Sequence, residues 1–160
     1  MHTAFLLLGS NLGDRRTNLE HAISLLKRAG EIISVSAVYE TAPWGRGDQP
    51  SFLNQAVSLR TGHEPEALLR QLKQVEAEVG RKESFTWGPR EIDVDILAID
   101  QITCRTETLT IPHPRLAERR FALVPLSEIA PGLMIPGTDA DVNGLLKNCA
   151  DPLEVSPADC

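Results

Sequence analysis

The sequence predicts an α+β domain in which two helices cover one face of an antiparallel sheet. A length of 160 residues suits one domain. Apolar residues make up 42% of the chain, which is enough for a core. Strand-like and helix-like segments alternate in the order strand, helix, strand, strand, helix, strand.

The first part of this pattern extends to residue 60. A continuous apolar run at residues 5–8 suits a central strand that is buried on both faces. Asp14 can cap a helix that ends at Gly30 and has apolar residues at helical spacing, namely Leu19, Ala22, Ile23 and Leu26. Residues 33–39 alternate as in a strand, residues 41–51 form a loop rich in glycine and proline, and residues 52–60 form the third strand.

The second part of the pattern completes the sandwich. Pro65 opens a helix that Gly80 closes, with apolar residues at Leu68, Leu72, Val75 and Val79. A loop covers residues 81–90, and residues 92–99 form the strongest strand. The βαββαβ order predicts a ferredoxin-like sandwich with both helices on one face of an antiparallel sheet.

The remaining residues predict C-terminal additions to this sandwich. We expect a short strand at residues 108–111, a short helix within 116–129 and another at 142–146. Residues 150–160 are expected to be a loose tail. Because no interdomain linker is found, residues 1–160 are expected to form one domain.

Composition argues against several classes of partner. The formal net charge of −6 argues against nucleic acid, because phosphate backbones are bound by surplus lysine and arginine. The apolar run near the N-terminus is too short for a signal peptide, and no stretch can span a bilayer. Three cysteines without a close pair or a metal-binding spacing indicate a reducing compartment. We therefore expect a cytoplasmic protein that acts as a monomer.

Two aspartates on the last strand are the most informative residues. Side chains alternate along a strand, so Asp93 and Asp95 share the face opposite to Ile92, Val94 and Ile96. Like charges about 7 Å apart on an apolar strand are costly unless a positive group lies between them. Magnesium prefers such hard oxygen ligands. The alternative is an exposed edge strand that carries two solvated aspartates.

Basic side chains flank this pair in the sequence: Arg81, Lys82, Arg90, His113, Arg115, Arg119 and Arg120. In an acidic chain this gathering indicates a site for a polyanion, such as a triphosphate, and its metals. Some of these side chains could instead pair with nearby glutamates, namely Glu83, Glu91 and Glu118. The segment GSNLGD at residues 9–14 lacks the Lys-Ser/Thr ending of a phosphate-binding loop, so side chains and metal would hold the phosphates.

An aromatic ring and an amide are expected beside the aspartates. Phe52 and Asn54 share one face of their strand, and we expect that face to be the one that carries the aspartates. Together they could stack on and hydrogen-bond a flat heterocycle. The alternative for Phe52 is a small apolar cluster under a loop. Trp44 and Trp87 lie in the two long loops, which could close over a site.

Six segments together resemble one enzyme family. They are LGSNLGD from Leu8, TAPWG from Thr41, FLNQAV from Phe52, WGPREIDVDIL from Trp87, IPHPRLAERRF from Ile111 and PLSEIAP from Pro125. In this order they resemble 6-hydroxymethyl-7,8-dihydropterin pyrophosphokinase, an enzyme family of folate biosynthesis, over nearly the whole chain. The patterns GPRxxDxD and PHPRxxxRxF are the specific ones.

The resemblance implies a ferredoxin-like fold, a reaction and a set of roles. The pterin hydroxymethyl oxygen would attack the β-phosphorus of ATP and release AMP, assisted by two magnesium ions bound to Asp93 and Asp95. Arg81, Arg90 and Asp95 would be catalytic, with Asp95 as a possible proton acceptor and the arginines and His113 neutralising the phosphates. The pterin pocket would contain Thr41, Ala42, Trp44, Phe52, Asn54 and Phe121, with the pterin stacked between the two phenylalanines. ATP would contact Glu76, Trp87, Ile96, Thr110, His113 and Arg119.

Two other functions remain open from the residues themselves. A nucleotidyltransferase also places paired aspartates on a strand, but it would release pyrophosphate. A ligand-binding module with structural aspartates would bind no magnesium–ATP and show no turnover.

Overall fold

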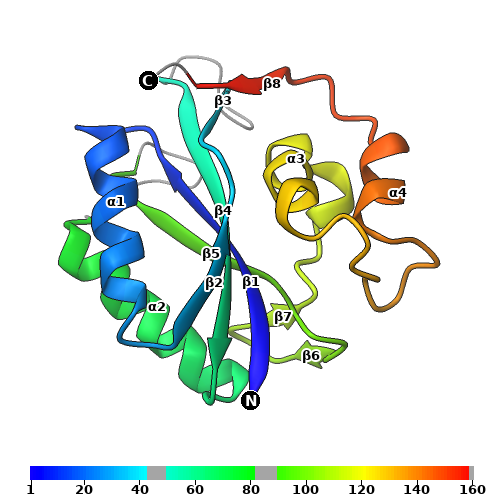
Figure 1. Ribbon diagram of the computed structural model, residues 1–160, viewed down its shortest axis with the longest axis horizontal. Helices are drawn as coiled ribbons and strands as arrows, with labels where there is room; N and C mark the ends of the chain where they lie inside the picture. Colours follow the sequence, from blue (N-terminus) through cyan, green and yellow to red (C-terminus); the bar gives the residue numbers. More distant parts are fainter. Residues whose placement is uncertain (43–49, 82–89, 159–160) are drawn as a thin grey trace.

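An antiparallel sheet forms the centre of the protein (Figure 1). The computed structural model describes residues 1–42, 50–81 and 90–158. Strands β1 (His2–Ser10), β4 (Phe52–Thr61) and β5 (Asp93–Ile99) are the long ones, and they lie in the order β5-β1-β4. Strand β3 (Tyr39–Thr41) follows β4, and β8 (Val155–Pro157) follows β3 at the edge. The predicted α+β class is therefore confirmed.

The predicted strand at residues 33–39 is two strands. β2 (Glu31–Val35) and β3 both pair with β4, but at opposite ends of it. Between them the Ser36 hydroxyl accepts a hydrogen bond from the Ala56 N–H at 2.9 Å. A side chain thus takes the place of a backbone carbonyl at this point, and the regular ladder is interrupted.

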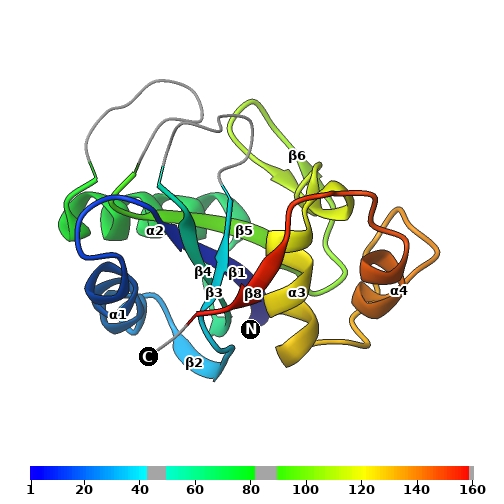
Figure 2. The same ribbon diagram turned by 90° about the horizontal axis from the view of Figure 1, so that it is seen from above.

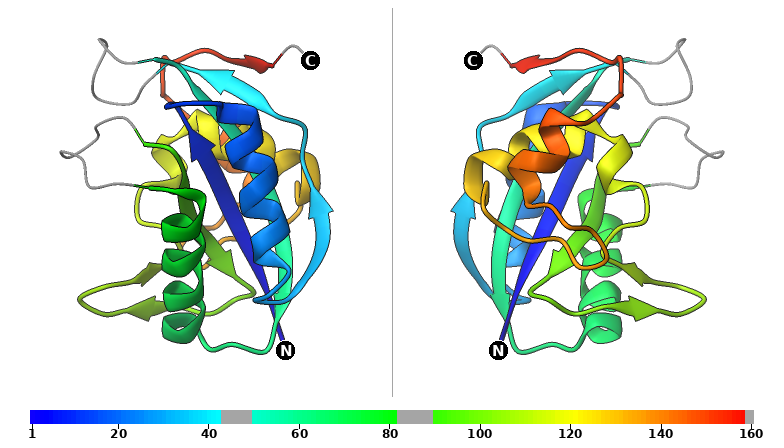
Figure 3. Two further views of the ribbon diagram at one scale, coloured as in Figure 1. Left: turned by 90° about the vertical axis from the view of Figure 1, so that its left-hand side faces the viewer. Right: turned by 90° about the vertical axis from the view of Figure 1, so that its right-hand side faces the viewer.

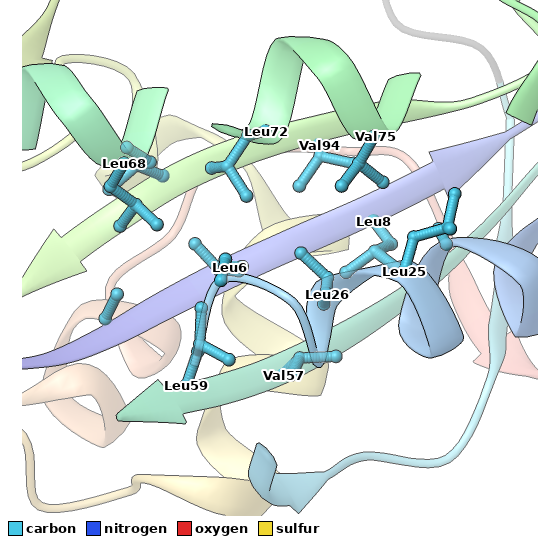
Figure 4. Close-up of a cluster of buried hydrophobic side chains, with 14 of the residues drawn as sticks. Leu6, Leu8, Leu25, Leu26, Val57, Leu59, Leu68, Leu72, Val75 and Val94 are labelled. Atoms are coloured by element: carbon cyan, nitrogen blue, oxygen red, sulfur yellow. The ribbon is translucent and has the colours of Figure 1, made fainter. Parts of the chain in front are cut away.

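Two helices cover one face of the sheet (Figure 3). Helix α1 (Arg15–Leu26) begins where the Asp14 side chain accepts a hydrogen bond from the Thr17 N–H at 3.1 Å. Helix α2 (Pro65–Val79) ends at Gly80, whose φ of 117° suits glycine. The core between helices and sheet is aliphatic (Figure 4), and its members include Leu6, Leu8, Leu25, Leu26, Val57, Leu59, Leu68, Leu72, Val75 and Val94.

The other face of the sheet is partly covered, whereas the sequence predicts helices on one face only. The 3₁₀ turn η1 (Leu116–Glu118), helix α3 (Arg120–Ile129) and helix α4 (Val142–Lys147) lie on this side (Figures 1 and 3). Leu7 and Leu97 of the sheet join Leu123 and Leu126 of α3 in a second buried cluster. A two-stranded sheet, β6 (Cys104–Arg105) with β7 (Thr110–Ile111), lies beside β5. The predicted additions at residues 108–111, 116–129 and 142–146 are thus present.

The C-terminal segment differs from its prediction as a loose tail. Strand β8 pairs with β3, with Thr41 opposite Val155, and the Ala158 N–H donates to the Val38 carbonyl at 2.9 Å. The tail prediction is wrong for residues 155–157, because β3 offers them an unpaired strand edge. Figure 2 shows β8 between β3 and α3. None of the described helices is long and apolar enough to cross a membrane.

Candidate active site

A pocket opens where α3 leaves the sheet face uncovered. It is lined by eleven residues: Leu7, Gly9, Thr41, Ala42, Phe52, Asn54, Arg90, Asp93, Asp95, Arg119 and Phe121. Nine of these are residues that the sequence assigns to a site. Trp44 and Trp87 lie outside the described residues, and Leu7 and Gly9 were not predicted as site residues.

Sheet register explains why the polar residues of three strands meet in the pocket. Gly9 of β1 lies opposite both Asn54 of β4 and Asp93 of β5. Asp95 lies opposite Leu7, two residues back along β1. A Cβ at Gly9 would lie 2.8 Å from Asn54 Nδ2 and 3.5 Å from the Phe52 ring. Glycine at this position therefore makes room for the amide and the ring, which is a role that the GSN segment could have signalled.

The apolar end of the pocket has a ring from the sheet and a ring from α3. They are Phe52 and Phe121, both of which line the pocket. Asn54 donates through Nδ2 to the Leu8 carbonyl at 3.3 Å, whereas its buried Oδ1 has no hydrogen-bond partner. A buried acceptor without a partner costs free energy, so a ligand N–H that reached this oxygen would be favoured. Two rings and an unpaired amide acceptor are suited to a flat nitrogen heterocycle.

The acidic end of the pocket contains a carboxylate held by two arginines. Arg81 Nη1 donates to Asp93 Oδ1 at 3.0 Å, and Arg90 Nη1 donates to Asp93 Oδ2 at 2.8 Å. The Arg81 Nη1 also lies 2.9 Å from Glu76 Oε2. The Asp93 side chain is only 19% exposed, so these are charge-assisted contacts of partly desolvated groups. The arginines that the sequence places near phosphates are thus bound to the predicted metal ligand.

Asp95 carries the most informative electrostatic feature of the pocket. Burial raises its pKa to about 7, and the negative charges of Asp93 and Glu76 act in the same direction. Arg119 and Arg90 oppose this rise without cancelling it. The two arginines thus do not offset the burial of Asp95 and the repulsion from Asp93 and Glu76, so a cation bound at these carboxylates would be favoured.

Glu76, which the resemblance assigns to ATP, is bonded to other protein groups in this structure. Its carboxylate is buried at the end of α2, and its Oε2 accepts a hydrogen bond from the Val94 N–H at 2.8 Å. Burial, the largest cause, raises its pKa, and its cationic neighbours are Arg81 at 2.9 Å and Lys73 at 3.5 Å. In this structure Glu76 ties α2 to the edge strand β5 and holds Arg81.

The outer edge of β5 brings together the other residues assigned to ATP. The Ile96 side chain is buried in the core under the helices, so it does not face the pocket. The Val94 N–H points away from β1, towards Glu76. Backbone groups alternate in direction along a strand, so the N–H and carbonyl of Ile96, two residues on, point the same way, and ATP would contact Ile96 through these backbone atoms. The His113 N–H donates to the Leu97 carbonyl at 2.9 Å. This bond and the contact between β7 and β5 place Thr110 and His113 along that edge.

His113 is a neutral side chain at neutral pH. Burial, together with the charges of Arg119 and Arg115, lowers its pKa to about 4. Its Nδ1 accepts a hydrogen bond from the Arg115 N–H at 3.1 Å, which leaves the ring proton on Nε2. In this form it can donate one hydrogen bond through Nε2, and its role in neutralising a phosphate stays a prediction.

Asn11 is a structural feature of the site that the sequence analysis missed. Its buried side chain accepts a hydrogen bond from the Arg90 N–H at 2.7 Å and donates to the Pro50 carbonyl at 3.3 Å. Its own N–H donates to the Arg90 carbonyl at 3.1 Å. One residue of the GSN segment thus fixes Arg90 against β1 and holds the start of β4 beside it.

Comparisons with known proteins agree with this geometry. The 2-amino-4-hydroxy-6-hydroxymethyldihydropteridine pyrophosphokinase of Aquifex aeolicus (strain VF5) is 47% identical over 136 residues, which is 85% of each chain. The protein of the same name from Bacillus subtilis (strain 168) is 44% identical over 142 residues, 88% of this chain and 85% of that one.

Solved structures and a family model point the same way. The crystal structure of Plasmodium falciparum HPPK-DHPS wild type with pteroate superposes with a TM-score of 0.74 at 17% identity. That superposition covers 92% of this chain but 42% of the longer one, and at this identity it shows the fold alone. Residues 5–131 match the model of 7,8-dihydro-6-hydroxymethylpterin-pyrophosphokinase (HPPK). The resemblance predicted from the sequence is therefore confirmed, and the chain belongs to the HPPK family.

Proposed function

We propose that this chain transfers a diphosphate group from ATP to the hydroxymethyl group of 6-hydroxymethyl-7,8-dihydropterin and releases AMP, in folate biosynthesis. The observation that supports this best is the composition of one pocket. It joins two aromatic rings and an unpaired amide acceptor to two carboxylates and two arginines, and a third arginine, Arg81, binds one of the carboxylates. Such a pocket suits a heterocycle at one end and a metal-bound polyphosphate at the other.

The strand arrangement supports the finer proposal of a ferredoxin-like layout. We take β2 and β3 as one broken strand. In the sheet order β5-β1-β4-β3, the first strand of the chain, β1, then lies between the two other long strands, β5 and β4. Both long helices lie on one face of this sheet (Figure 3). This is the arrangement expected when two βαβ units interleave.

For the pterin we propose the apolar end of the pocket. Phe52 and Phe121 would stack on the two faces of the ring system, and the Asn54 Oδ1 would accept a hydrogen bond from a ring or amino N–H. Thr41 and Ala42 border the same space, and Trp44 is assigned to it by resemblance. The Thr41 hydroxyl donates to the Glu154 carbonyl at 3.0 Å, so Thr41 would contribute its methyl group or its main chain.

For magnesium we propose the side chains of Asp93 and Asp95. Both carboxylates face the pocket and both have hard oxygen donors, and the buried Asp95 carboxylate, which Asp93 and Glu76 repel, would gain from a bound cation. No group of three or more His, Cys, Asp or Glu side chains in the described part of the chain could hold a metal by itself. ATP oxygens and water would therefore complete the coordination of two ions, and the ions would supply Lewis-acid stabilisation of the charge on the phosphates.

For the triphosphate we propose the arginines and the outer edge of β5. Arg81 and Arg90 lie at the acidic end and would turn from Asp93 to the phosphates when the carboxylate takes up a metal. Arg119 and the neutral His113 would donate to the same group, while Thr110, the Ile96 main chain and Trp87 would contact the nucleoside. In this proposal Glu76 contributes by holding Arg81 and β5 in place.

Asp95 is also our proposal for the proton acceptor. Its carboxylate lines the pocket with Phe52 and Asn54, next to the proposed pterin position. Positioning and charge stabilisation would carry the remainder of the acceleration.

Product analysis tests the function directly. The protein is mixed with magnesium, ATP and the hydroxymethyl dihydropterin, and the products are separated by ion-exchange chromatography. We expect AMP and the pterin diphosphate in equal amounts. Pyrophosphate release would instead indicate a nucleotidyltransferase, and no turnover would indicate a binding module. Asp95→Asn should remove the activity, whereas Asp100→Asn removes a charge just after the same strand, outside the pocket, and should retain it.

We also propose that the protein acts in the cytoplasm and as a monomer. Among the described residues Cys104 and Cys149 are both free, which agrees with a reducing compartment.

A further inference from the structure

The C-terminal segment connects the two walls of the pterin pocket. We name residues 149–157 the strap. One wall of the pocket is the end of β3, with Thr41 and Ala42, and the other is the start of α3, with Arg119 and Phe121. Figure 1 shows the strap running from α4 over the molecule to β3, and Figure 2 shows its strand β8 between β3 and α3.

At the α3 end the strap is fixed by a reciprocal set of hydrogen bonds. The Arg120 N–H donates to Asp151 Oδ2 at 3.1 Å, so this buried carboxylate receives the first N–H of α3. In return, Arg120 Nε donates to the Asp151 carbonyl at 3.2 Å and Nη2 donates to the Cys149 carbonyl at 2.8 Å. Asp151 Oδ1 accepts from the Leu153 N–H at 2.9 Å, which orders the strap itself. Arg120 stands between the two residues of α3's first turn that line the pocket.

At the β3 end the strap is fixed to a pocket residue. β8 pairs with β3 in register, with Val155 opposite Thr41. The Thr41 hydroxyl donates to the Glu154 carbonyl at 3.0 Å. Val155 also packs against the buried cluster that contains Phe121. The strap therefore contacts both walls within a few residues of its length.

The other end of α3 shows why such a link is needed. There Tyr39 Oη donates to Glu128 Oε1 at 2.6 Å and the Ala37 N–H donates to Glu128 Oε2 at 3.0 Å. Near its C-terminal end α3 is thus bound directly to β3 and the residues before it. At its N-terminal end the pocket lies between Phe121 and Thr41.

We propose that Asp151 and Arg120 are positioning residues for the reaction: through the strap they hold Phe121 and Thr41 at the separation that the pterin needs. The proposal rests on the assignment of this pocket to the pterin. Loss of the Arg120–Asp151 contacts would leave α3's first turn free to move, and only a fraction of molecules would then have a closed pocket. Apparent affinity falls by that fraction, so the effect appears in pterin binding. ATP, which in this proposal meets the first turn of α3 through Arg119 and otherwise lies along β5, would be affected less than the pterin.

Calorimetry with the intact protein tests this. Asp151→Ala and Arg120→Ala should each raise the pterin Kd by about tenfold. The Kd of an unreactive ATP analogue should rise by clearly less than the pterin Kd, by about twofold to threefold through Arg119, and kcat at saturating pterin should change by less than about twofold. Asp151→Asn keeps one carbonyl oxygen of the two acceptors and should give an intermediate pterin Kd. The matched control is Asp141→Ala, which removes the N-cap of α4, a bond of 2.8 Å to the Gly144 N–H, without touching the strap. It should lower Tm and leave both affinities unchanged.

A second measurement starts from the wild-type protein. Because coupling between two sites is reciprocal, pterin binding should slow amide hydrogen exchange in residues 151–157, including residues that do not line the pocket. Asp151→Ala should abolish this protection. If Asp151→Ala fails to fold, Arg120→Ala and the wild-type exchange data decide the question.

Phe52→Ala separates the strap from the pocket assignment. If Phe52→Ala weakens pterin binding while neither strap variant does, the strap is packing only and the proposal is wrong. If Phe52→Ala has no effect either, the pocket assignment fails, and the strap proposal fails with it. Equal losses of pterin and ATP affinity in the strap variants would also overturn it, because that result indicates a general loss of structure.

Discussion

Replacing Asp95 by asparagine should stabilise the unliganded protein and inactivate it at the same time. The pKa of Asp95 is raised in the folded state, from an ordinary 3.8 to about 7, chiefly by burial. A raised carboxyl pKa means that the folded state binds the proton more tightly than the unfolded state does. Stability from this group is therefore complete below about pH 4 and is lost as the pH rises towards 7. Asparagine resembles the protonated form and keeps that stability at every pH.

The size of the effect follows from the shift. Three pKa units correspond to about 4 kcal/mol, which is an upper limit because water enters the pocket and the side chains relax. We expect Asp95→Asn to raise the free energy of unfolding by about 1–3 kcal/mol at pH 8 and by roughly a third of that at pH 5, because pH 5 lies about one unit above the unfolded pKa. For a chain of this length that is a Tm increase of about 2–10 °C at pH 8. Turnover should fall by about a hundredfold or more, because the substitution also removes a metal ligand.

Urea unfolding of the two proteins in EDTA, at intervals from pH 5 to pH 8, measures the difference. Glu76, whose pKa burial also raises, is one of the charges that repel Asp95, so relief of this repulsion is part of the gain that is measured. Asp100→Asn, which also removes one carboxylate but outside the pocket, serves as the control for the change in net charge. A gain for Asp95→Asn that is equal at pH 5 and pH 8, or a loss at pH 8, would refute the electrostatic account of the site.

Two further predictions concern individual side chains. Arg90→Ala removes the 2.8 Å contact to Asp93 Oδ2 and should tighten Mg²⁺ binding to the ATP-free protein by about 1 kcal/mol, yet slow the chemical step by about a hundredfold. Calorimetry measures the Mg²⁺ affinity, and single-turnover kinetics measure the rate of the chemical step. If Arg90→Ala lowered both the affinity and the rate, or raised both, the proposal that Asp93 exchanges its arginines for metal would be contradicted. Phe52→Ala and Phe121→Ala should each weaken pterin binding by about 1–3 kcal/mol, with a smaller change for ATP. Parallel titrations of both ligands check this, and equal losses would argue against stacking.

Much of the sandwich could be predicted because its signals are local. The period of apolar residues, a cap at Asp14 and glycine at position 80 are enough to place α1 and α2. Side-chain alternation correctly places Asp93 and Asp95 on the face opposite to Val94. The break between β2 and β3 was missed because it depends on the contact between Ser36 and Ala56, which lie 20 residues apart.

The site was less predictable where roles depend on long-range contacts. The sequence identifies Arg81 and Arg90 as basic but not that both bind Asp93. His113 has no local signal for a pKa of about 4, since the cause is burial by the fold and the proximity of Arg119. The strap was predicted as a tail because β8 has only three residues, and its place follows from the free edge of β3 and from Asp151.

The charges of the pocket indicate how the reactants must enter. Around Asp93 the carboxylates of Asp93, Asp95 and Glu76 are matched by the guanidinium groups of Arg81, Arg90 and Arg119. Two magnesium ions and one triphosphate with about four negative charges are likewise matched to each other. Either reactant alone would leave the partly desolvated cluster with an uncompensated charge, whereas both together leave it balanced. Metal and ATP should therefore increase each other's affinity, and the pair can enter when Asp93 exchanges its arginines for metal and the freed arginines bind phosphate. The arginines that bind Asp93 in this structure would thus be the groups that hold the diphosphate during its transfer.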